Sequence, residues 1–406
     1  MIDDSLRTSG VSRHRALKAV LTAGPPAAAF TAYGVLIDHL PDTWFALDGL
    51  RYLLALLAAG VIWLGLAALR RLPAVAQPLD DAGPATEIPA VSWPAPSSLS
   101  MVAKRKLIDT SRSMPDHSEL RGWCQFLDEA LPPSATGTSY GLRLVLALDL
   151  HHPLLDRAML VRTLMALQCE GGGWAARSQR GIGRPEVTSW ALGAVSRAGL
   201  DPAEQARLVA LLEDITRKDQ VGLERTTVIS TVVATLAEVA PASPLLPELA
   251  HYLVTSATRS RDGAGWGERL VNSPSPSTAH TARAIVALRR AADVLPHHGE
   301  LDDSVEAGLA WLVRSRDLAD RSERLRRPVG ANLDTITIDH FTVAWVAKAL
   351  LACDDPAPAM LRDSMETILA RQENGIWRWQ EVRPIWMTYQ GLSVVRDYAM
   401  RRPMST

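Results

Sequence analysis

Two long apolar stretches stand out near the start of the chain. Residues 19–37 and 52–69 contain no charged side chain, and each is close to the roughly 20 apolar residues that cross a bilayer core. Basic residues lie before the first stretch and after the second, whereas aspartates dominate the connection. The positive-inside rule then places both ends in the cytoplasm. The pattern predicts a cytosolic tail (1–18) and a two-helix transmembrane hairpin (19–71), hence a two-pass protein of the bacterial cytoplasmic membrane. A cleaved signal peptide is the alternative for the first stretch.

The apolar pattern changes after the second stretch. Residues 72–117 are rich in Pro, Ala and Ser without a sustained apolar period, which predicts a linker. Residues 118–401 then show a repeated helical pattern. Six nearly uncharged apolar runs each begin at a threonine, which suits an N-cap or first-turn position. These runs are predicted to be buried inner helices, and they begin at Thr138, Thr188, Thr227, Thr281, Thr342 and Thr388.

A more amphipathic segment precedes each of these runs. Helices that carry charge on one face are expected to pack as an outer ring around uncharged ones. Each helix pair needs neighbours on both sides to bury its apolar surface. The predicted fold is therefore all-α, an (α/α)6 toroid over residues 118–401. The predicted outer helices cover residues 119–131, 155–167, 202–216, 247–258, 303–314 and 359–370.

Glycine-rich turns ending in tryptophan punctuate the repeats. The segments LQCEGGGW, SRDGAGW and RQENGIW end at Trp174, Trp266 and Trp377. Together with the threonine starts, they resemble the repeats of squalene-hopene cyclases and of protein prenyltransferase β subunits, members of the terpenoid-cyclase and prenyltransferase superfamily. The resemblance implies the toroid fold, and it implies that these tryptophans staple neighbouring helices.

Charge and cysteine content exclude some classes of function. The chain has 43 basic and 44 acidic side chains, so it lacks the basic excess expected of a nucleic-acid-binding protein. Its three cysteines are scattered along the sequence. They predict neither a disulfide framework nor a close-spaced metal cluster, and they fit a reducing compartment.

Candidate chemistry is sparse. The acidic Asp-x-Asp-Asp cluster that the resemblance to cyclases would imply is absent. The nearest polar group is Asp334, Asp339 and His340, just before the fifth inner helix. An acid beside a histidine can act as a catalytic acid/base pair or as metal ligands, but it can equally be a helix cap with a solvated histidine. The arginine-rich segment 321–328 could receive a diphosphate, but a solvated loop is the favoured interpretation.

The resemblance to protein prenyltransferases also implies a possible zinc ion. Those enzymes bind zinc through an Asp, a Cys and a His at the starts of inner helices. The step from His280 to Thr281 resembles their histidine ligand, whereas the expected cysteine is missing. A zinc site built from His280, Asp339 and His340 is therefore one hypothesis, and capping roles for the same residues are the other.

Aromatic residues of the inner helices are candidates for ligand contacts. Aromatic faces stabilise carbocations by cation–π attraction, although each of these rings could equally be packing. The sequence predicts a mostly apolar central funnel for an isoprenoid, a lipid-like molecule or a peptide. The predicted substrate-binding residues are Tyr140, Trp190, Trp345, Trp386 and Tyr389.

Two functions follow from this pattern. The first is a ligand- or partner-binding sensor or effector at the membrane, with a possible protein partner and a role in bacterial conflict or antiphage defence. The second is a divergent prenyltransferase or terpene cyclase that acts on an isoprenoid in the barrel. A scaffold without a ligand is a weaker third interpretation. Because fold does not determine function, the choice depends on the site itself.

Overall fold

The structure is a computed structural model, and all of the described residues belong to one compact unit, Ile88–Thr406. The residues that it describes are 96–179, 181–261, 263–272, 275–296, 298–353 and 357–401.

The transmembrane hairpin predicted over residues 19–71 lies outside the described residues. The longest helices within them, α8, α13 and α16, have 17 residues each (Pro202–Lys218, Gly299–Ser315 and Ile385–Arg401), fewer than the roughly 20 that a bilayer core requires. None of the described helices is long and apolar enough to span a membrane. The prediction of a two-pass membrane protein is therefore not supported: the described part of the chain is mostly helical and contains no membrane span.

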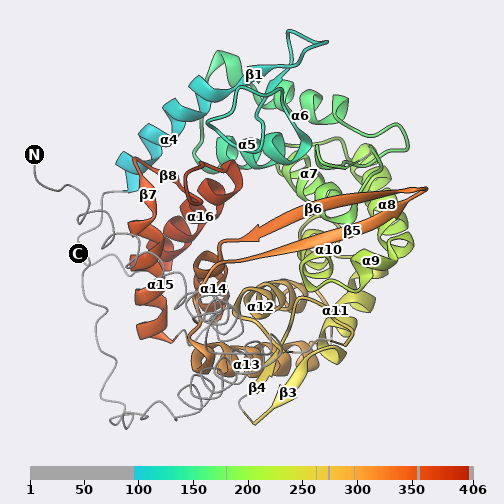
Figure 1. Ribbon diagram of the computed structural model, residues 1–406, viewed down its shortest axis with the longest axis vertical. Coiled ribbons are helices and arrows are strands. Elements are labelled where there is room, and N and C mark those ends of the chain that lie inside the picture. Colours follow the sequence, from blue (N-terminus) through green and yellow to red (C-terminus); the bar gives the residue numbers. More distant parts are fainter. Residues whose placement is uncertain are drawn as a thin grey trace, which may run out of the picture. The chain divides into compact units, whose positions relative to one another are not determined.

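Six helices form an inner ring. They correspond to the six apolar runs predicted from the sequence. Each contacts the next along the chain, and the last contacts the first, so that the ring closes (Figure 1). Their side chains are mostly buried, in keeping with their low charge. The inner helices are α5 (Ala135–Ala147), α7 (Pro185–Arg197), α10 (Thr226–Val239), α12 (Thr278–Ala292), α14 (Thr342–Leu351) and α16.

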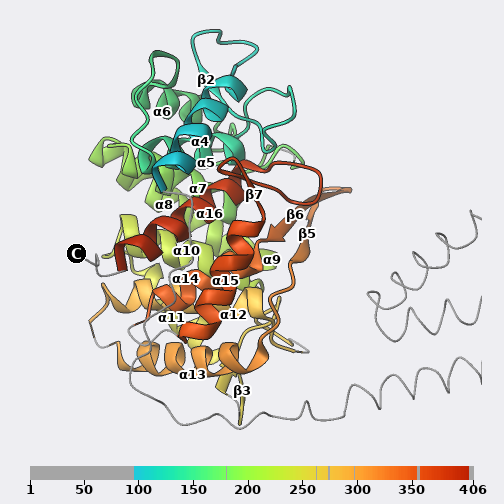
Figure 2. The same ribbon diagram turned by 90° about the vertical axis from the view of Figure 1, so that its left-hand side faces the viewer.

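Amphipathic helices surround this ring. Two short helical segments, η2 (Pro153–Leu155) and α9 (Gln220–Leu223), lie in the connections. The outer helices run beside the inner ones (Figure 2). They are α4 (Pro96–Thr110), α6 (Arg157–Ala166), α8, α11 (Leu245–Thr255), α13 and α15 (Pro358–Ala370).

The first outer helix is not where the sequence pattern placed it. Residues 119–131 contain no helix, and α4 lies instead inside the predicted linker 72–117. Ala103 and Leu107, one turn apart on α4, are fully buried against the core. Gly122 instead lets the chain pass close to α5, because a Cβ atom there would lie only 2.4 Å from the hydroxyl of Thr138.

Four tryptophans clasp outer helices to inner ones. In each clasp the indole N–H donates to a carbonyl near the end of an outer helix, and a threonine hydroxyl accepts from the backbone N–H of the same tryptophan. This threonine is the fourth residue of its inner helix, so it is not an N-cap. The pairs are Trp123 with Thr138, Trp174 with Thr188, Trp266 with Thr281, and Trp377 with Thr388.

The prediction of an all-α fold is wrong in one important respect. Strands β5 (Arg321–Val329) and β6 (Asn332–His340) form an antiparallel hairpin, hereafter the hairpin, in which Arg321 pairs with His340. The two-residue turn places Gly330 at a φ of 59°, a conformation that glycine adopts without strain. Three smaller antiparallel pairs are β1 with β2 (Arg112–Ser113, Arg121–Gly122), β3 with β4 (Thr258–Ser260, Gly263–Gly265) and β7 with β8 (Gln372–Glu373, Ile376–Trp377).

The hairpin lies across one mouth of the ring. In Figure 1 it runs from α14 over the opening toward α8 and α9. Thr136 and Trp386, at the starts of α5 and α16, line a pocket together with Ile338 of the hairpin, so the covered mouth is the one at which inner helices begin. Segment 321–328, expected to be a solvated loop, instead buries Glu323, Leu325 and Arg327, because alternate strand residues face the ring.

Candidate functional site: a cationic central cavity and a buried histidine–glutamate cluster

A cavity occupies the centre of the ring, and all six inner helices contribute to its lining. Its volume is about 660 Å³ when the part open to solvent is included. Tyr140, Trp190, Trp345 and Tyr389, which were predicted to contact a ligand, all line it. Trp386, the fifth predicted residue, lines the adjoining pocket under the hairpin, which Tyr140 and Trp190 also reach.

The cavity is cationic, so the prediction of a mostly apolar funnel is wrong. Arg143, Arg283, Arg290 and Lys348 are part of its lining. The acid beside them is Glu238, which pairs with Arg197 and lies 3.9 Å from Arg290. No carboxylate of the described residues forms an ion pair with the other three cations.

These three cations contact neutral groups instead: aromatic ring faces, the backbone carbonyl of Trp190 and, for Arg283, the imidazole of His340. Arg143 donates to the carbonyl of Trp190 at 3.2 Å, and its Nε has no hydrogen-bond partner. The guanidinium of Arg283 lies 4.1 Å from the ring centre of Trp345. The ammonium of Lys348 lies 5.1 Å from the same ring and 5.4 Å from that of Tyr389. Cation–π contacts compensate only part of the desolvation of a charge.

The cavity shifts the pKa values of its titratable groups. Burial lowers the pKa of Lys348 to about 8. Burial would raise the pKa of Tyr389, but the cations Arg143, Lys348 and Arg197 outweigh it and lower that pKa to about 7. Tyr140 has the opposite shift, since burial raises its pKa to about 12. Positive charge is therefore in excess in the part of the cavity around Tyr389.

A spectroscopic titration tests this excess. We expect Tyr389 to lose its proton near pH 7, about three units below an ordinary tyrosine, and to give a phenolate absorption band at neutral pH. Tyr389→Phe should remove this component, whereas the matched variant Tyr140→Phe should leave it in place. A titration curve that Tyr389→Phe does not alter would contradict the predicted charge distribution.

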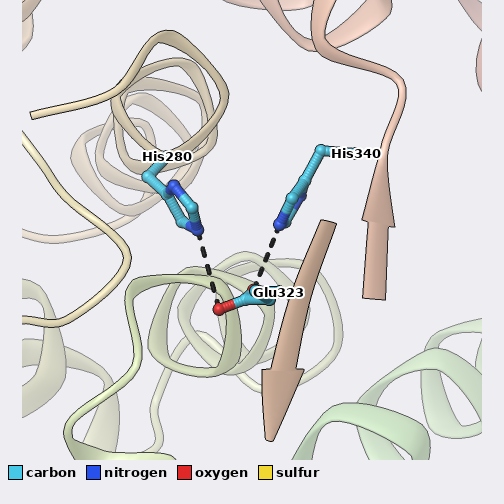
Figure 3. A group of neighbouring side chains, drawn as sticks. All are labelled: His280, Glu323 and His340. Atoms are coloured by element: carbon cyan, nitrogen blue, oxygen red, sulfur yellow. Dashed lines mark ion pairs between the residues drawn. The ribbon is translucent and has the colours of Figure 1, made fainter. Parts of the chain in front are cut away.

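A second polar group lies at the mouth that the hairpin covers. His280 is in the first turn of α12, Glu323 is on β5, and His340 is the last residue of β6 (Figure 3). Their exposed fractions are 3, 2 and 0%. Nε2 of His280 lies 3.6 Å from Oε2 of Glu323, and Nε2 of His340 lies 3.2 Å from Oε1. One potential ligand atom from each residue falls within 4.8 Å of the other two.

The hydrogen-bond partners of the two imidazoles differ. Nδ1 of His280 lies 2.6 Å from the hydroxyl of Ser277, and Nδ1 of His340 accepts from Nε of Arg283 at 3.1 Å. Burial lowers the pKa of His340 to about 4, so its imidazole is neutral at pH 7. Neutral imidazoles and a carboxylate are groups that zinc and related metal ions bind.

The predicted zinc ligands are only partly brought together. His280 and His340 meet as predicted, but Asp339 is not with them, because neighbouring strand residues point to opposite faces. Asp339 instead accepts a 2.5 Å hydrogen bond from Ser322. Glu323 takes the third position. The period-two alternation of residues 333–340 was the signal for a strand, and its partner strand would have pointed to this glutamate.

The predicted catalytic group of Asp334, Asp339 and His340 is likewise not assembled. Asp334 lies toward the far end of β6, where its carboxylate forms a buried 2.6 Å ion pair with Arg184. Across the strand pair, Arg327 lies between the carboxylates of Glu186 and Asp219, at 2.9 and 2.7 Å. These five residues form the tip cluster, which fastens the end of the hairpin to α7 and to the α8–α9 junction.

Comparison with known proteins adds no identification. No protein-family model matches the sequence, and no curated protein matches it significantly. The resemblance to terpenoid cyclases and prenyltransferases therefore stays a prediction.

Proposed function

We propose that this chain is a ligand-binding toroid whose central cavity takes a small organic anion, a phosphate or diphosphate ester with an apolar or planar group. One observation carries the proposal. The cations Arg143, Arg283, Arg290 and Lys348 converge on a cavity that also presents four aromatic rings, and Glu238 is the one acid that the structure describes in an ion pair with this group.

A bound anion would offset the cost of burying these cations. Buried charges without a counter-ion destabilise a folded chain, and the lowered pKa of Lys348 has this cause. Arginine and lysine form short charge-assisted hydrogen bonds with phosphate oxygens. The free Nε of Arg143 and the ammonium of Lys348 are donors available for such bonds. The rings of Trp190 and Trp345 offer flat apolar surface to the remainder of the ligand.

A central cavity suits a sensor better than a site on the surface of the toroid does. Since every inner helix contributes to its lining, an occupant would contact all six and stabilise the closed ring. Ligand binding would thus be transmitted to the whole toroid. A protein partner and a role in bacterial conflict remain predictions from the sequence.

The alternative, a divergent prenyltransferase or terpene cyclase, has less support. Asp334 is engaged in an ion pair and Asp339 accepts a hydrogen bond from Ser322. A general acid needs a proton that it can deliver to the substrate. Asp334 is held by Arg184, and Asp339 lines the pocket under the hairpin but is not part of the lining of the central cavity.

Calorimetric titration tests the proposal. The full chain is titrated with inorganic pyrophosphate, ADP and geranyl diphosphate, which share the anion and differ in what is attached to it. We expect at least one diphosphate to bind, and Lys348→Met to weaken binding about tenfold or more, equivalent to about 1.4 kcal/mol. The same substitution should raise the melting temperature of the free protein, because it removes a buried charge that forms no ion pair with a carboxylate of the described residues.

The control is Arg324→Met, on the exposed side of the hairpin, which removes a cation without touching the cavity. Preference for ADP would indicate a nucleotide-type ligand, and preference for geranyl diphosphate an isoprenoid one. Absence of binding by all three probes, or equal affinities of Lys348→Met and wild type, would reject the anion site.

A further inference from the structure

We propose that His280, Glu323 and His340 bind one divalent transition-metal ion, zinc before others, and that this ion fastens the base of the hairpin to helix α12. None of the three ligands lines the proposed anion cavity, and Arg283 is the residue that borders both sites. The metal site uses a glutamate that the sequence had not singled out, and it ties together three segments of the chain, α12, β5 and β6 (Figure 3).

The spacing of the ligand atoms fits a metal ion. Zinc binds imidazole nitrogen and carboxylate oxygen at about 2.0–2.2 Å in a tetrahedral arrangement, which separates neighbouring ligand atoms by about 3.3–3.6 Å. The two nitrogen–oxygen distances are 3.6 Å for His280 and 3.2 Å for His340. One ligand atom from each of the three residues lies within 4.8 Å of the other two, so the side chains need only draw together to hold one ion.

The direction of these groups favours a shared central ion over direct hydrogen bonds. Nε2 of both histidines and both carboxylate oxygens of Glu323 are buried without a hydrogen-bond partner. Nε2 of His340 lies 3.2 Å from Oε1 of Glu323, which is short enough for a hydrogen bond. The two groups are nevertheless not oriented for a well-directed bond. Four buried polar atoms that lack a well-directed hydrogen bond would be costly, although the imidazoles and the carboxylate attract one another. A metal cation placed between these atoms would compensate each nitrogen or oxygen that coordinates it.

The residues around the site differ in how well they suit a metal ion. The Ser277 hydroxyl can accept a hydrogen bond from Nδ1–H of His280, which leaves Nε2 free to ligate. Arg283 acts in the opposite sense, because it donates to Nδ1 of His340 and thereby keeps the proton of the neutral ring on Nε2. Metal binding would move this proton to Nδ1 and displace Arg283.

This competition gives the proposal its sharpest test. Removal of Arg283 takes away both a competing donor and a nearby positive charge, so Arg283→Met should bind the metal more tightly than wild type. Glu323→Gln should bind it at least tenfold more weakly, because an amide is a much poorer ligand than a carboxylate. Opposite effects of two neighbouring substitutions are not expected from general damage to the fold.

The experiment uses the full chain, stripped of metal by a chelator and dialysed. Zinc is titrated and its stoichiometry measured by elemental analysis. Cobalt(II) serves as a second probe, since its visible absorption reports coordination geometry. We expect one ion per chain, a tetrahedral cobalt spectrum, and slower amide hydrogen exchange of β5 and β6 when metal is bound. His251→Gln, an exposed histidine that pairs with Glu300, is the control.

Both outcomes are decisive. Stoichiometric binding that is lost in Glu323→Gln and in His280→Gln, with circular dichroism unchanged and His251→Gln like wild type, supports the site. The proposal is overturned if the chain binds no zinc or cobalt, or if the two ligand variants bind as wild type does. Because the readouts are metal content and hairpin exchange, they are independent of whether the central cavity binds an anion.

Discussion

Replacing Arg327 with methionine should lower the free energy of unfolding by about 3–5 kcal/mol, the usual cost of removing one partner of a buried ion pair. Arg327 is 2% exposed and bonds to both Glu186 and Asp219. Methionine fills similar volume, but it leaves two carboxylates in the tip cluster without their arginine. The hairpin tip should then detach from α7, and amide hydrogens of β5 and β6 should exchange faster.

Chemical denaturation and hydrogen exchange measure these two effects. Arg324→Met and Arg326→Met are matched controls on the same strand, because their side chains lie on its exposed side. The double variant Arg327→Met with Glu186→Gln should recover part of the lost free energy of unfolding, since it removes one of the two carboxylates left without a partner. If Arg327→Met is no more destabilising than the two controls, the tip cluster does not hold the hairpin.

Replacing Trp266 with alanine should destabilise the chain by about 3–5 kcal/mol, as for other large-to-small changes of buried aromatics. Trp266 is 1% exposed, its indole N–H bonds to the carbonyl of Leu253 at 2.8 Å, and its backbone N–H bonds to Thr281 at 2.9 Å. It therefore joins the end of α11 to the start of α12.

Trp266→Phe separates packing from hydrogen bonding. It keeps most of the ring but orphans the carbonyl of Leu253, for which we expect a loss of about 1–3 kcal/mol. Trp379→Ala, at a half-buried tryptophan outside the clasps, is the comparison and should cost less than Trp266→Ala. Equal losses for Trp266→Phe and Trp266→Ala would mean that the hydrogen bond, rather than the ring, supplies the stability of the clasp.

The repeat of helices could be predicted from the sequence because its signals are local. Uncharged apolar runs that begin at a threonine identified all six inner helices, and glycine–tryptophan turns identified three of the four clasps. Trp123 was missed although a glycine also precedes it in the segment RGWC, because the helical pattern predicted that segment to be part of an outer helix. The helix predicted around it hid both the fourth clasp and the true first outer helix.

The metal-ligand cluster and the cavity cations were harder to predict, because they depend on the register of the strands and on which side of each helix faces the centre of the ring. Two of the three clustered metal-ligand candidates, His280 and His340, could be named, but Glu323 joins them only through the pairing of β5 with β6. The cavity cations were overlooked because single basic residues interrupt otherwise uncharged inner helices. Such isolated charges, for example Arg143 in α5 and Lys348 in α14, face the centre of the ring.

The inner helices begin at the mouth that the hairpin covers, and this common direction has an electrostatic consequence. Aligned peptide dipoles leave partial positive charge at the covered mouth and partial negative charge at the other. Anions in proteins commonly bind at helix N-termini, where backbone amides hold them. Arg143, Arg290 and Lys348 lie in the C-terminal halves of their helices, so an anion there must be held by side-chain charge alone. The pKa of Lys348 is about 8, so this side chain loses its charge in mildly alkaline solution, and the affinity of the cavity for an anion should fall there. Added salt should also lower this affinity, because it screens the charges.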